Sequence, residues 1–375
     1  MSSPEPISST TPRKIEWLDG LRGVAALAVL LAHIRNLVLP DVLFARYVPL
    51  GGWIERSPLM LLTAGNLAVR IFFIHSGFVL SWKYLNRPDL RILASMSLRR
   101  LFRLGIPIAV AILFAFGLMR LGLMRNVEMG GLTHAKAPLV LHYRFEPTAA
   151  SAMSDIFGGW FVHESVRYDG ALWTMPIELI CSYVVFLTLP LLILFRSRLA
   201  TLALLAASLA LLGSYPWVAY FMVGILFVQL HRSFPQIRAV IAWPLLLLAV
   251  VLGVFVAAEA VQLFSSALIV ALLFSRERWR RLLLRPATQF LGRTSFSVYL
   301  IHIPLLCSFS SAVFIGLHRR GVPHLANAAA TALVTIAVAY ALSWAMWRWV
   351  DRFAINFGKA PLERYLYRAR VVRAR

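Results

Sequence analysis

The sequence predicts an all-α, polytopic membrane protein with about ten transmembrane helices and both termini in the cytoplasm. Composition carries the first part of this prediction. Hydrophobic residues make up 60% of the 375 residues and charged residues only 14%, whereas soluble proteins carry about 25% charged residues. The formal net charge is +22, but the basic residues punctuate apolar runs instead of lining one face. This pattern indicates membrane topology and argues against nucleic acid as a partner.

The expected spans were judged against the roughly 20 apolar residues that cross a bilayer core. They lie near 20–39, 65–85, 104–123, 171–195, 199–214, 216–231, 238–257, 259–275, 290–316 and 325–348. The fifth and sixth are short, and the seventh and eighth share one apolar block that we split at Glu259. With this count, most of the 38 Lys and Arg residues fall on the side of the termini. The positive-inside rule therefore places both termini in the cytoplasm.

The two ends of the chain are expected to be tails. Residues 1–15 are rich in Ser, Thr and Pro and lack the basic start and cleavage site of a secretory signal, so they predict a disordered N-terminal tail. Residues 16–350 form the expected membrane domain, and 351–375 a basic cytoplasmic tail. The long loop near 124–170 is expected to cap an outward-facing substrate site, with a short interfacial helix near 153–163.

Ionisable residues inside the spans mark the candidate site, because charge in a bilayer is costly and is kept mainly for function. Arg22 lies at the inner edge of the first span, and His33 lies roughly 16 Å further along the same helix. Glu178 enters the fourth span from the outside to a similar depth. We therefore predict that Glu178 bonds the imidazole of His33 and raises its basicity. A histidine that only holds helices together is the alternative.

Three further stretches carry polar residues. Arg99 and Arg103 are four residues apart, so they share a helix face and form a fork suited to phosphate. Positive-inside anchoring is the alternative explanation of this pair. Ser76 is small and suits close helix packing, and its neighbour His75 points about 100° away, which argues against a serine nucleophile. His302 lies in the outer half of the ninth span, where a packing role is the simpler interpretation of this residue alone.

The order of five stretches resembles the acyltransferase 3 family, whose members are multi-pass membrane acyltransferases that modify carbohydrates and other extracytoplasmic acceptors. The stretches are LDGLRGVAALAVLLAH, FFIHSGF, Arg99 with Arg103, LWTMPIEL and SFSVYLIHIP. The resemblance extends from about residue 16 to residue 350. Many members have two consecutive acids where this chain has Glu178 and Leu179, so a role for a second carboxylate has no counterpart here.

The resemblance implies transfer of an acyl group, with acetyl expected, from cytoplasmic acyl-CoA to a hydroxyl of an outer acceptor. The acceptor classes are a carbohydrate, a glycolipid or a small molecule. Acyl-CoA is then a co-substrate, and no permanently bound cofactor and no metal are expected. His33 and Glu178 are the expected catalytic residues, with His33 as general base or as a transiently acylated nucleophile. The expected substrate-binding residues are Asp19, Arg22, Ser76, Arg99, Arg103, Trp173, Tyr299 and His302.

A transporter or flippase for an anionic lipid or sugar, with His and Glu as a proton relay, is the alternative class. The sequence shows no pair of matching Gly- or Pro-broken helices that favours it. Arg far outnumbers Lys, which hints at a GC-rich bacterial genome. The expected location is therefore the bacterial cytoplasmic (inner) membrane, with the lipid bilayer as a partner and the oligomeric state left open.

Overall fold

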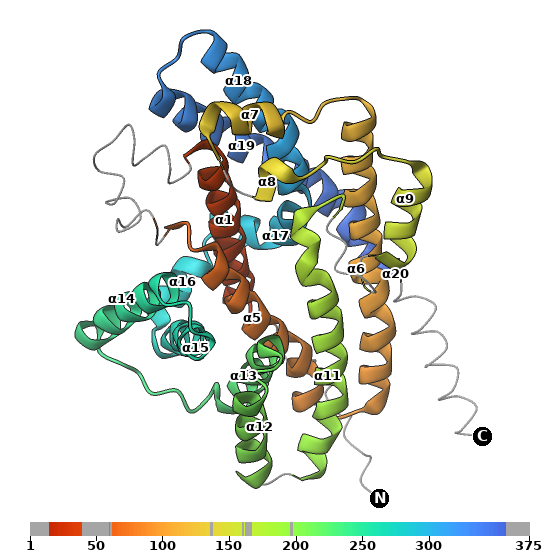
Figure 1. Cartoon of the computed structure of the whole chain (residues 1–375). Coiled ribbons are helices and arrows are strands. Elements are labelled where there is room, and N and C mark those ends of the chain that lie inside the picture. Colours follow the sequence, from red (N-terminus) through yellow and green to blue (C-terminus); the bar gives the residue numbers. More distant parts are fainter. Residues whose placement is uncertain are drawn as a thin grey trace, which may run out of the picture.

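The computed structural model describes residues 15–39, 60, 62–135, 138–159, 161, 167–195 and 198–357, whose regular structure is helical throughout (Figure 1). The predicted all-α class is confirmed. Five helices surround the site, namely α1 (Trp17–Val38), α5 (Gly65–Asn86), α6 (Leu90–Arg120), α11 (Thr174–Leu194) and α17 (Pro286–Leu305). The other elements after residue 170 are η2 (Gly170–Trp173), α12 (Arg198–Ala210), α13 (Pro216–Leu230), α14 (Ala239–Phe255), α15 (Glu259–Ser275), α16 (Glu277–Leu283), η3 (Leu306–Ser310), α18 (Ser311–Arg319), α19 (His324–Met346), η4 (Trp347–Asp351) and α20 (Arg352–Phe357).

The described residues contain fewer full-length spans than the ten predicted for the chain. Within the described ranges, five helical segments are long and apolar enough to cross a bilayer, namely Trp17–Val38, Leu90–Arg120, Gly170–Leu194, Pro286–Arg319 and His324–Phe357. A sixth is added if α15 and α16, bent by 100°, form one span. The shorter apolar helices α12, α13 and α14 have at most 17 residues, and a 13-residue helix covers only about 20 Å. Ten full spans are therefore not confirmed, because hydropathy found the apolar runs but not how far each helix extends.

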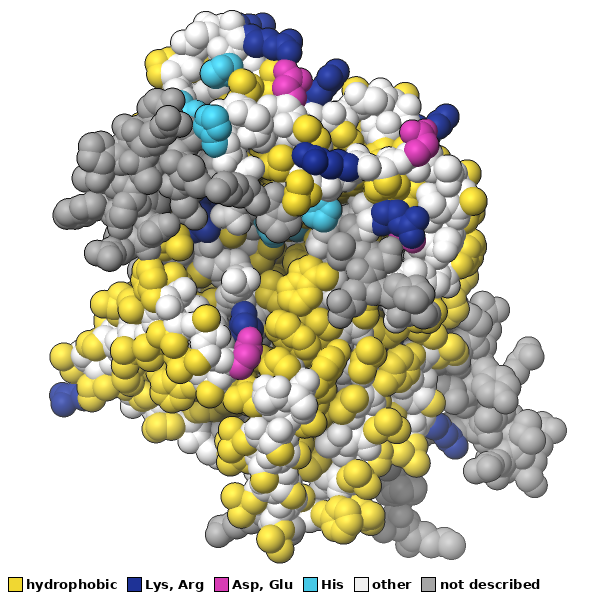
Figure 2. All heavy atoms as spheres, in the orientation of Figure 1, with side chains coloured by type: hydrophobic (Ala, Val, Ile, Leu, Met, Phe, Trp, Pro, Cys, Tyr) yellow, Lys and Arg dark blue, Asp and Glu magenta, His cyan; other side chains and the backbone are white. Residues whose placement is uncertain are grey.

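The surface of the helices is suited to lipid. Figure 2 shows hydrophobic side chains over most of the lower part of one face, whereas basic, acidic and histidine side chains gather mainly toward the upper end near α7 and α18. Leu187, Leu199 and Val240 are each 75% exposed. Large exposed apolar surfaces are rare on soluble monomers, and several helices here are long and apolar enough to cross a bilayer, so the chain is a multi-pass membrane protein.

Close backbone contacts at glycines hold the centre of the bundle together. A Cβ atom at Gly23 of α1 would lie 2.4 Å from the Gly292 nitrogen of α17, and one at Gly77 of α5 would lie 2.1 Å from the Phe221 oxygen of α13. Both distances exclude any larger side chain, because small residues are what lets membrane helices approach this closely. The result is that Arg22 and Ser76, which neighbour these glycines, are placed at helix–helix contacts.

A cap of short helices, drawn in yellow to yellow-green, extends from α18 to α6 at one end of the bundle (Figure 1). It consists of α7 (Asn126–Thr133), α8 (Pro138–Leu141), α9 (Ala149–Ser154) and the π-turn η1 (Asp155–Gly159). Asn126 Nδ2 donates to the carbonyl oxygens of Leu139 and His142, at 2.8 and 2.9 Å. The short helix expected near 153–163 corresponds to the end of α9 and to η1; residues 160 and 162–163 lie outside the described residues.

The other end of the bundle contains both ends of the described chain, since Ile15 and Ile355 line one cavity. The C-terminal helical segment runs through η4 and α20 to Phe357. The first residues of the expected tail 351–375 are therefore helical and packed, while residues 358–375 and residues 1–14 lie outside the described part of the chain.

Candidate functional site

Two adjoining cavities lie between the helices. The central cavity, with a volume of about 120 Å³, is bounded by α1, α5, α6, α11 and α17. The terminal cavity, of about 350 Å³, extends toward Ile15 and Ile355 and is bounded by α1, α5, α6, α17 and the η4–α20 segment. Both cavities are lined by Arg22, His75, Val79, Arg103 and Phe296. The two cavities therefore adjoin at these residues, with the terminal cavity toward the chain ends and the central cavity in the interior of the bundle.

Guanidinium groups dominate the junction of the cavities. Arg22 Nη2 donates to the Gly292 carbonyl oxygen at 2.8 Å, and its Nε has no hydrogen-bond partner among the described residues. Arg103 lines both cavities, and within the described ranges no hydrogen bond or ion pair engages its side chain. Asp351 of η4 lies within electrostatic range of both guanidinium groups, but neither group forms an ion pair within the described ranges, so the junction still suits an anionic ligand.

The partner of Glu178 and the arginines that line the cavity differ from the sequence prediction. Glu178 accepts a hydrogen bond from Arg100, and the two side chains are 13% and 8% exposed. The structure thus replaces the predicted Glu178–His33 pair with a Glu178–Arg100 ion pair. Arg100 lines the central cavity with Arg103, whereas Arg99 is absent from the described lining of both cavities. Arg100, three residues before Arg103 and on a shared helix face, thus lines the central cavity in place of Arg99, and the Arg99–Arg103 fork stays a prediction.

Two histidines meet beyond the central cavity. The ring centroids of His33 on α1 and His302 on α17 are 5.1 Å apart. His302 is 1% exposed, and its Nδ1 lies 2.7 Å from the carbonyl oxygen of Tyr299. Because a carbonyl oxygen only accepts, Nδ1 carries the proton and Nε2 keeps a free lone pair. That Nε2 atom is buried and has no hydrogen-bond partner in the described part of the chain.

Tyr299 connects the histidine pair to the central cavity. It lines that cavity together with Thr174, whose Oγ1 lies 2.8 Å from the Tyr299 hydroxyl. The ring centroid of Tyr299 is 5.7 Å from that of His302. The order of groups from the chain ends inward is therefore Arg22 with Arg103, then Tyr299 with Thr174, and then the histidine pair.

The cap supplies further groups to the far side of the histidine pair. His142 lies within electrostatic range of His33, as does Arg35 of α1 itself, and His142 Nε2 lies against Gly170, where a Cβ atom would be only 2.7 Å away. Burial lowers the pKa of His142 below its ordinary value. The pKa of Asp169 is raised well above its usual range by burial, although its carboxyl accepts a hydrogen bond from the Ala171 nitrogen at 2.9 Å. At both positions burial thus favours the neutral form of the side chain.

The remaining predicted residues lie in different places. Ser76 lines the central cavity and Asp19 the terminal cavity. Trp173 is 37% exposed and its ring packs 5.5 Å from that of Trp217, away from the described lining of both cavities. Among the residues that the structure describes, no three His, Cys, Asp or Glu side chains form a metal-binding group. Thr174, the next residue, lines the central cavity instead of Trp173.

Sequence reasoning did not single out two residues of the site. Arg100 was hidden within a basic run, where only its spacing from Arg103 distinguishes it. Asp351 lines the terminal cavity and was assigned to the tail, although it follows an aromatic stretch, WRWV, that continues the last helix. Helical periodicity of this stretch is the signal that was available.

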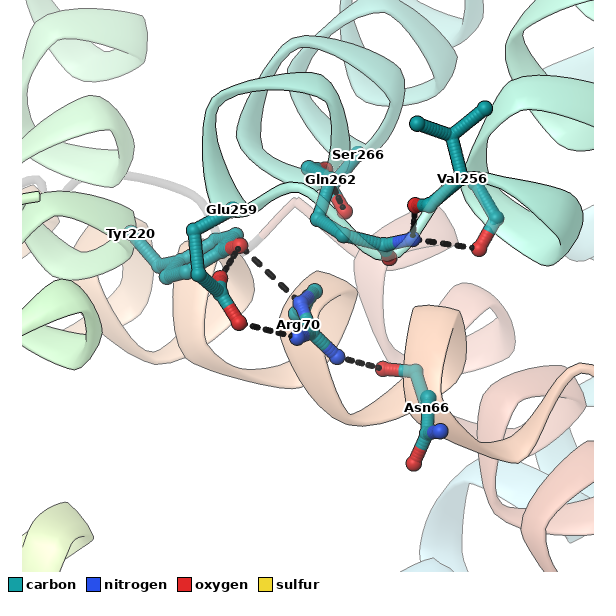
Figure 3. Close-up of polar contacts among 8 residues, drawn as sticks. Asn66, Arg70, Tyr220, Val256, Glu259, Gln262 and Ser266 are labelled. Carbon is teal, nitrogen blue, oxygen red and sulfur yellow. Dashed lines mark hydrogen bonds and ion pairs between the residues drawn. The ribbon is translucent and has the colours of Figure 1, made fainter.

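A separate polar cluster ties three helices together away from the cavities (Figure 3). Arg70 of α5 donates to Glu259 Oε1 at 2.5 Å and to the Tyr220 hydroxyl at 3.0 Å, and that hydroxyl donates to Glu259 Oε2 at 2.9 Å. The Arg70 guanidinium also lies 5.7 Å from the ring centroid of Trp217. Every charged group of the cluster is paired, so its role is to join α5, α13 and α15.

Comparison with known proteins gives one match. A family model described as an acyltransferase domain matches residues 15–348, which covers every helix from α1 through α19. No curated protein matches the chain, and no solved structure matches it.

Proposed function

Because the chain belongs to the acyltransferase 3 family, we propose that it transfers an acyl group from cytoplasmic acyl-CoA to a hydroxyl of an acceptor beyond the opposite face of the membrane. The observation that carries this proposal is the guanidinium of Arg103, which makes no hydrogen bond or ion pair among the described residues and lines two adjoining cavities. Tyr299 lines the inner of these cavities, and its ring contacts His302 of the histidine pair. A phosphate-bearing donor satisfies that charge, and a group extending from it reaches the histidines.

The donor is proposed to enter through the terminal cavity. Its phosphates bind Arg22 and Arg103 through charge-assisted hydrogen bonds. Arg22 and His33 are eleven residues apart on one helix, a rise of roughly 16 Å, which an extended pantetheine arm of about 20 Å spans. The thioester is thereby delivered past Tyr299 to the histidine pair, and acetyl is the proposed acyl group.

The histidine pair accounts for the proton in the reaction. The acceptor oxygen attacks the thioester carbonyl carbon, so a carbon–oxygen bond forms and the carbon–sulfur bond breaks. His33, on the side of the cap, takes the proton of the acceptor hydroxyl as general base. That proton then passes to His302 Nε2, whose lone pair is free, and from there to the departing thiolate. No proton is gained or lost overall, and the 5.1 Å between the ring centroids permits the proton to pass between the two imidazoles.

The acceptor is proposed to approach from the cap. The cap groups nearest to His33 include His142, a neutral group that hydrogen-bonds hydroxyls without attracting a particular charge. A carbohydrate, a glycolipid or a small hydroxylated molecule fits this side. The proposed location is the bacterial cytoplasmic membrane, with the cap on the outer side.

The experiment is label transfer in membranes that contain the protein. Membranes are incubated with acetyl-CoA labelled in the acetyl group, and label in alkali-labile ester is separated into protein and non-protein fractions. The wild type is expected to label non-protein material, and His33→Ala and His302→Ala are each expected to lose that label while the protein stays folded. Acceptor labelling at the wild-type rate in either variant contradicts the mechanism. Label held on His33 of the protein favours the acyl-histidine route, and transport without label transfer favours the flippase class.

A further inference from the structure

The terminal cavity contains a carboxylate that the proposed reaction does not use. Asp351, the last residue of the π-turn η4, is 5% exposed and lines this cavity. Its Oδ2 accepts a hydrogen bond from Ser297 Oγ at 2.6 Å. Its Oδ1 is buried and has no hydrogen-bond partner among the described residues. Leaving a buried charged oxygen without a partner is costly, so this atom is suited to a hydrogen-bond donor of the ligand.

The groups around Asp351 differ in what they bind. Arg22 and Arg103 line the same cavity and attract phosphate, whereas the Asp351 carboxylate repels phosphate and accepts from N–H or O–H groups. The carboxylate therefore faces a part of the ligand that is neutral and carries a hydrogen-bond donor. The arginines therefore suit the anionic part of a ligand, and Asp351 suits its neutral part.

Aromatic side chains complete the wall. Trp82 and Trp347 line the terminal cavity, and Trp347 is four residues before Asp351, so the π-turn directs both toward the ligand space. The Arg293 guanidinium lies 5.8 Å from the ring centroid of Trp347 and lines the same cavity. Flat aromatic faces, guanidinium groups and one hydrogen-bond acceptor together fit a phosphorylated nucleoside.

We propose that Asp351 is a specificity residue, whose Oδ1 accepts a hydrogen bond from an N–H or O–H group in the nucleoside part of the acyl donor. This inference rests on the proposed function, since it assigns the nucleoside end of the donor to the terminal cavity. The acyl-bearing arm then leaves that cavity between Arg22 and Arg103 and enters the central cavity. Ser297 fixes the rotamer of the carboxylate through the hydrogen bond to Oδ2.

The test measures binding of the whole donor and of its two halves to the purified full-length protein in detergent. The probes are acetyl-CoA, adenosine 3′,5′-bisphosphate for the nucleoside half and acetyl-phosphopantetheine for the arm. The variants are Asp351→Asn, which keeps the shape of the side chain, and Ser297→Ala, which frees the carboxylate. Glu277→Gln is the matched control, because Glu277 is 68% exposed and pairs with Arg281 on the surface of α16.

Asp351→Asn is expected to weaken the binding of acetyl-CoA and of the bisphosphate by roughly fivefold to tenfold, because the amide oxygen of Asn still accepts the hydrogen bond but lacks the charge that strengthens it. The same variant is expected to leave the affinity for acetyl-phosphopantetheine unchanged or slightly higher, since a charge that repels phosphate is removed. Ser297→Ala is expected to weaken the binding of the bisphosphate by a smaller factor, and Glu277→Gln is expected to leave the binding of all three probes unchanged. Equal effects of Asp351→Asn on the two halves, or no effect on either, overturn the inference. If the folded wild type binds none of the three probes, the proposed function fails and this inference with it.

Discussion

Replacement of Glu178 by Gln is expected to lower the free energy of unfolding by about 3–5 kcal/mol, the cost of removing one partner of a buried ion pair. The magnitude follows from burial, because the Arg100 and Glu178 side chains are 8% and 13% exposed. Arg100 Nε already has no hydrogen-bond partner among the described residues. Loss of the carboxylate therefore leaves a guanidinium charge uncompensated in surroundings of low dielectric constant.

The assay is denaturant unfolding of the purified protein in detergent, with a second ion pair as control. Arg319 and Glu128 also form an ion pair, but their side chains are 71% and 39% exposed, so Glu128→Gln is expected to cost less than about 1 kcal/mol. The double variant Arg100→Gln/Glu178→Gln is expected to recover most of the loss, because no unpaired charge remains. If Glu178→Gln costs no more than Glu128→Gln, the reasoning from burial is refuted.

Three further predictions concern packing and the cap. Gly77→Leu is expected to prevent folding, because even a Cβ atom would lie 2.1 Å from a carbonyl oxygen of α13. Gly117→Ala is expected to be tolerated, because a Cβ atom there would have nothing within 4 Å. The yield of monodisperse protein compares the two variants, and equal yields would contradict the close approach at Gly77. Tyr299→Phe removes the 2.8 Å hydrogen bond to Thr174 and is expected to cost about 1 kcal/mol of unfolding free energy, so an unchanged midpoint would count against that bond. Burial lowers the folded-state pKa of His142. The unfolded state therefore binds the proton first, and the free energy of unfolding falls as pH drops below about 6.5. His142→Asn is expected to flatten this part of the stability profile, and an unchanged slope would assign the pH dependence to another group.

Hydropathy predicted the helices well and their lengths poorly. Each apolar run falls on a helix, because burial in lipid and helix formation both depend on the same continuous stretch of apolar residues. The ends depend on tertiary contacts instead. α6 begins at Leu90, well before the apolar run that starts near residue 104, because Asp89 caps the helix through a hydrogen bond to the Arg91 nitrogen. The last helical segment likewise continues past the apolar run to Phe357.

The sequence predicted how deep each site residue lies in the membrane, but not toward which neighbouring helix its side chain points. Counting residues along α1 and α17 placed His33 and His302 each in the outer half of its span, and the structure brings the two rings together. The same counting placed Glu178 near the depth of His33, yet its side chain points to α6 and Arg100. Rise per residue fixes height along a helix, whereas the rotation of each helix is set by packing against its neighbours. One sequence does not contain that rotation in readable form.

The central claim is that the unpaired guanidinium of Arg103 binds the acyl donor. The most direct measurement is the dissociation constant of acetyl-CoA for the purified protein, compared among the wild type, Arg103→Ala and Arg91→Ala. Arg91 is a matched control because it lies exposed on the same helix, outside the lining of both cavities. We predict saturable binding to the wild type and to Arg91→Ala, and binding at least roughly tenfold weaker to Arg103→Ala, since a charge-assisted hydrogen bond contributes about 1.5–3 kcal/mol. Equal affinity of Arg103→Ala and the wild type would contradict the account.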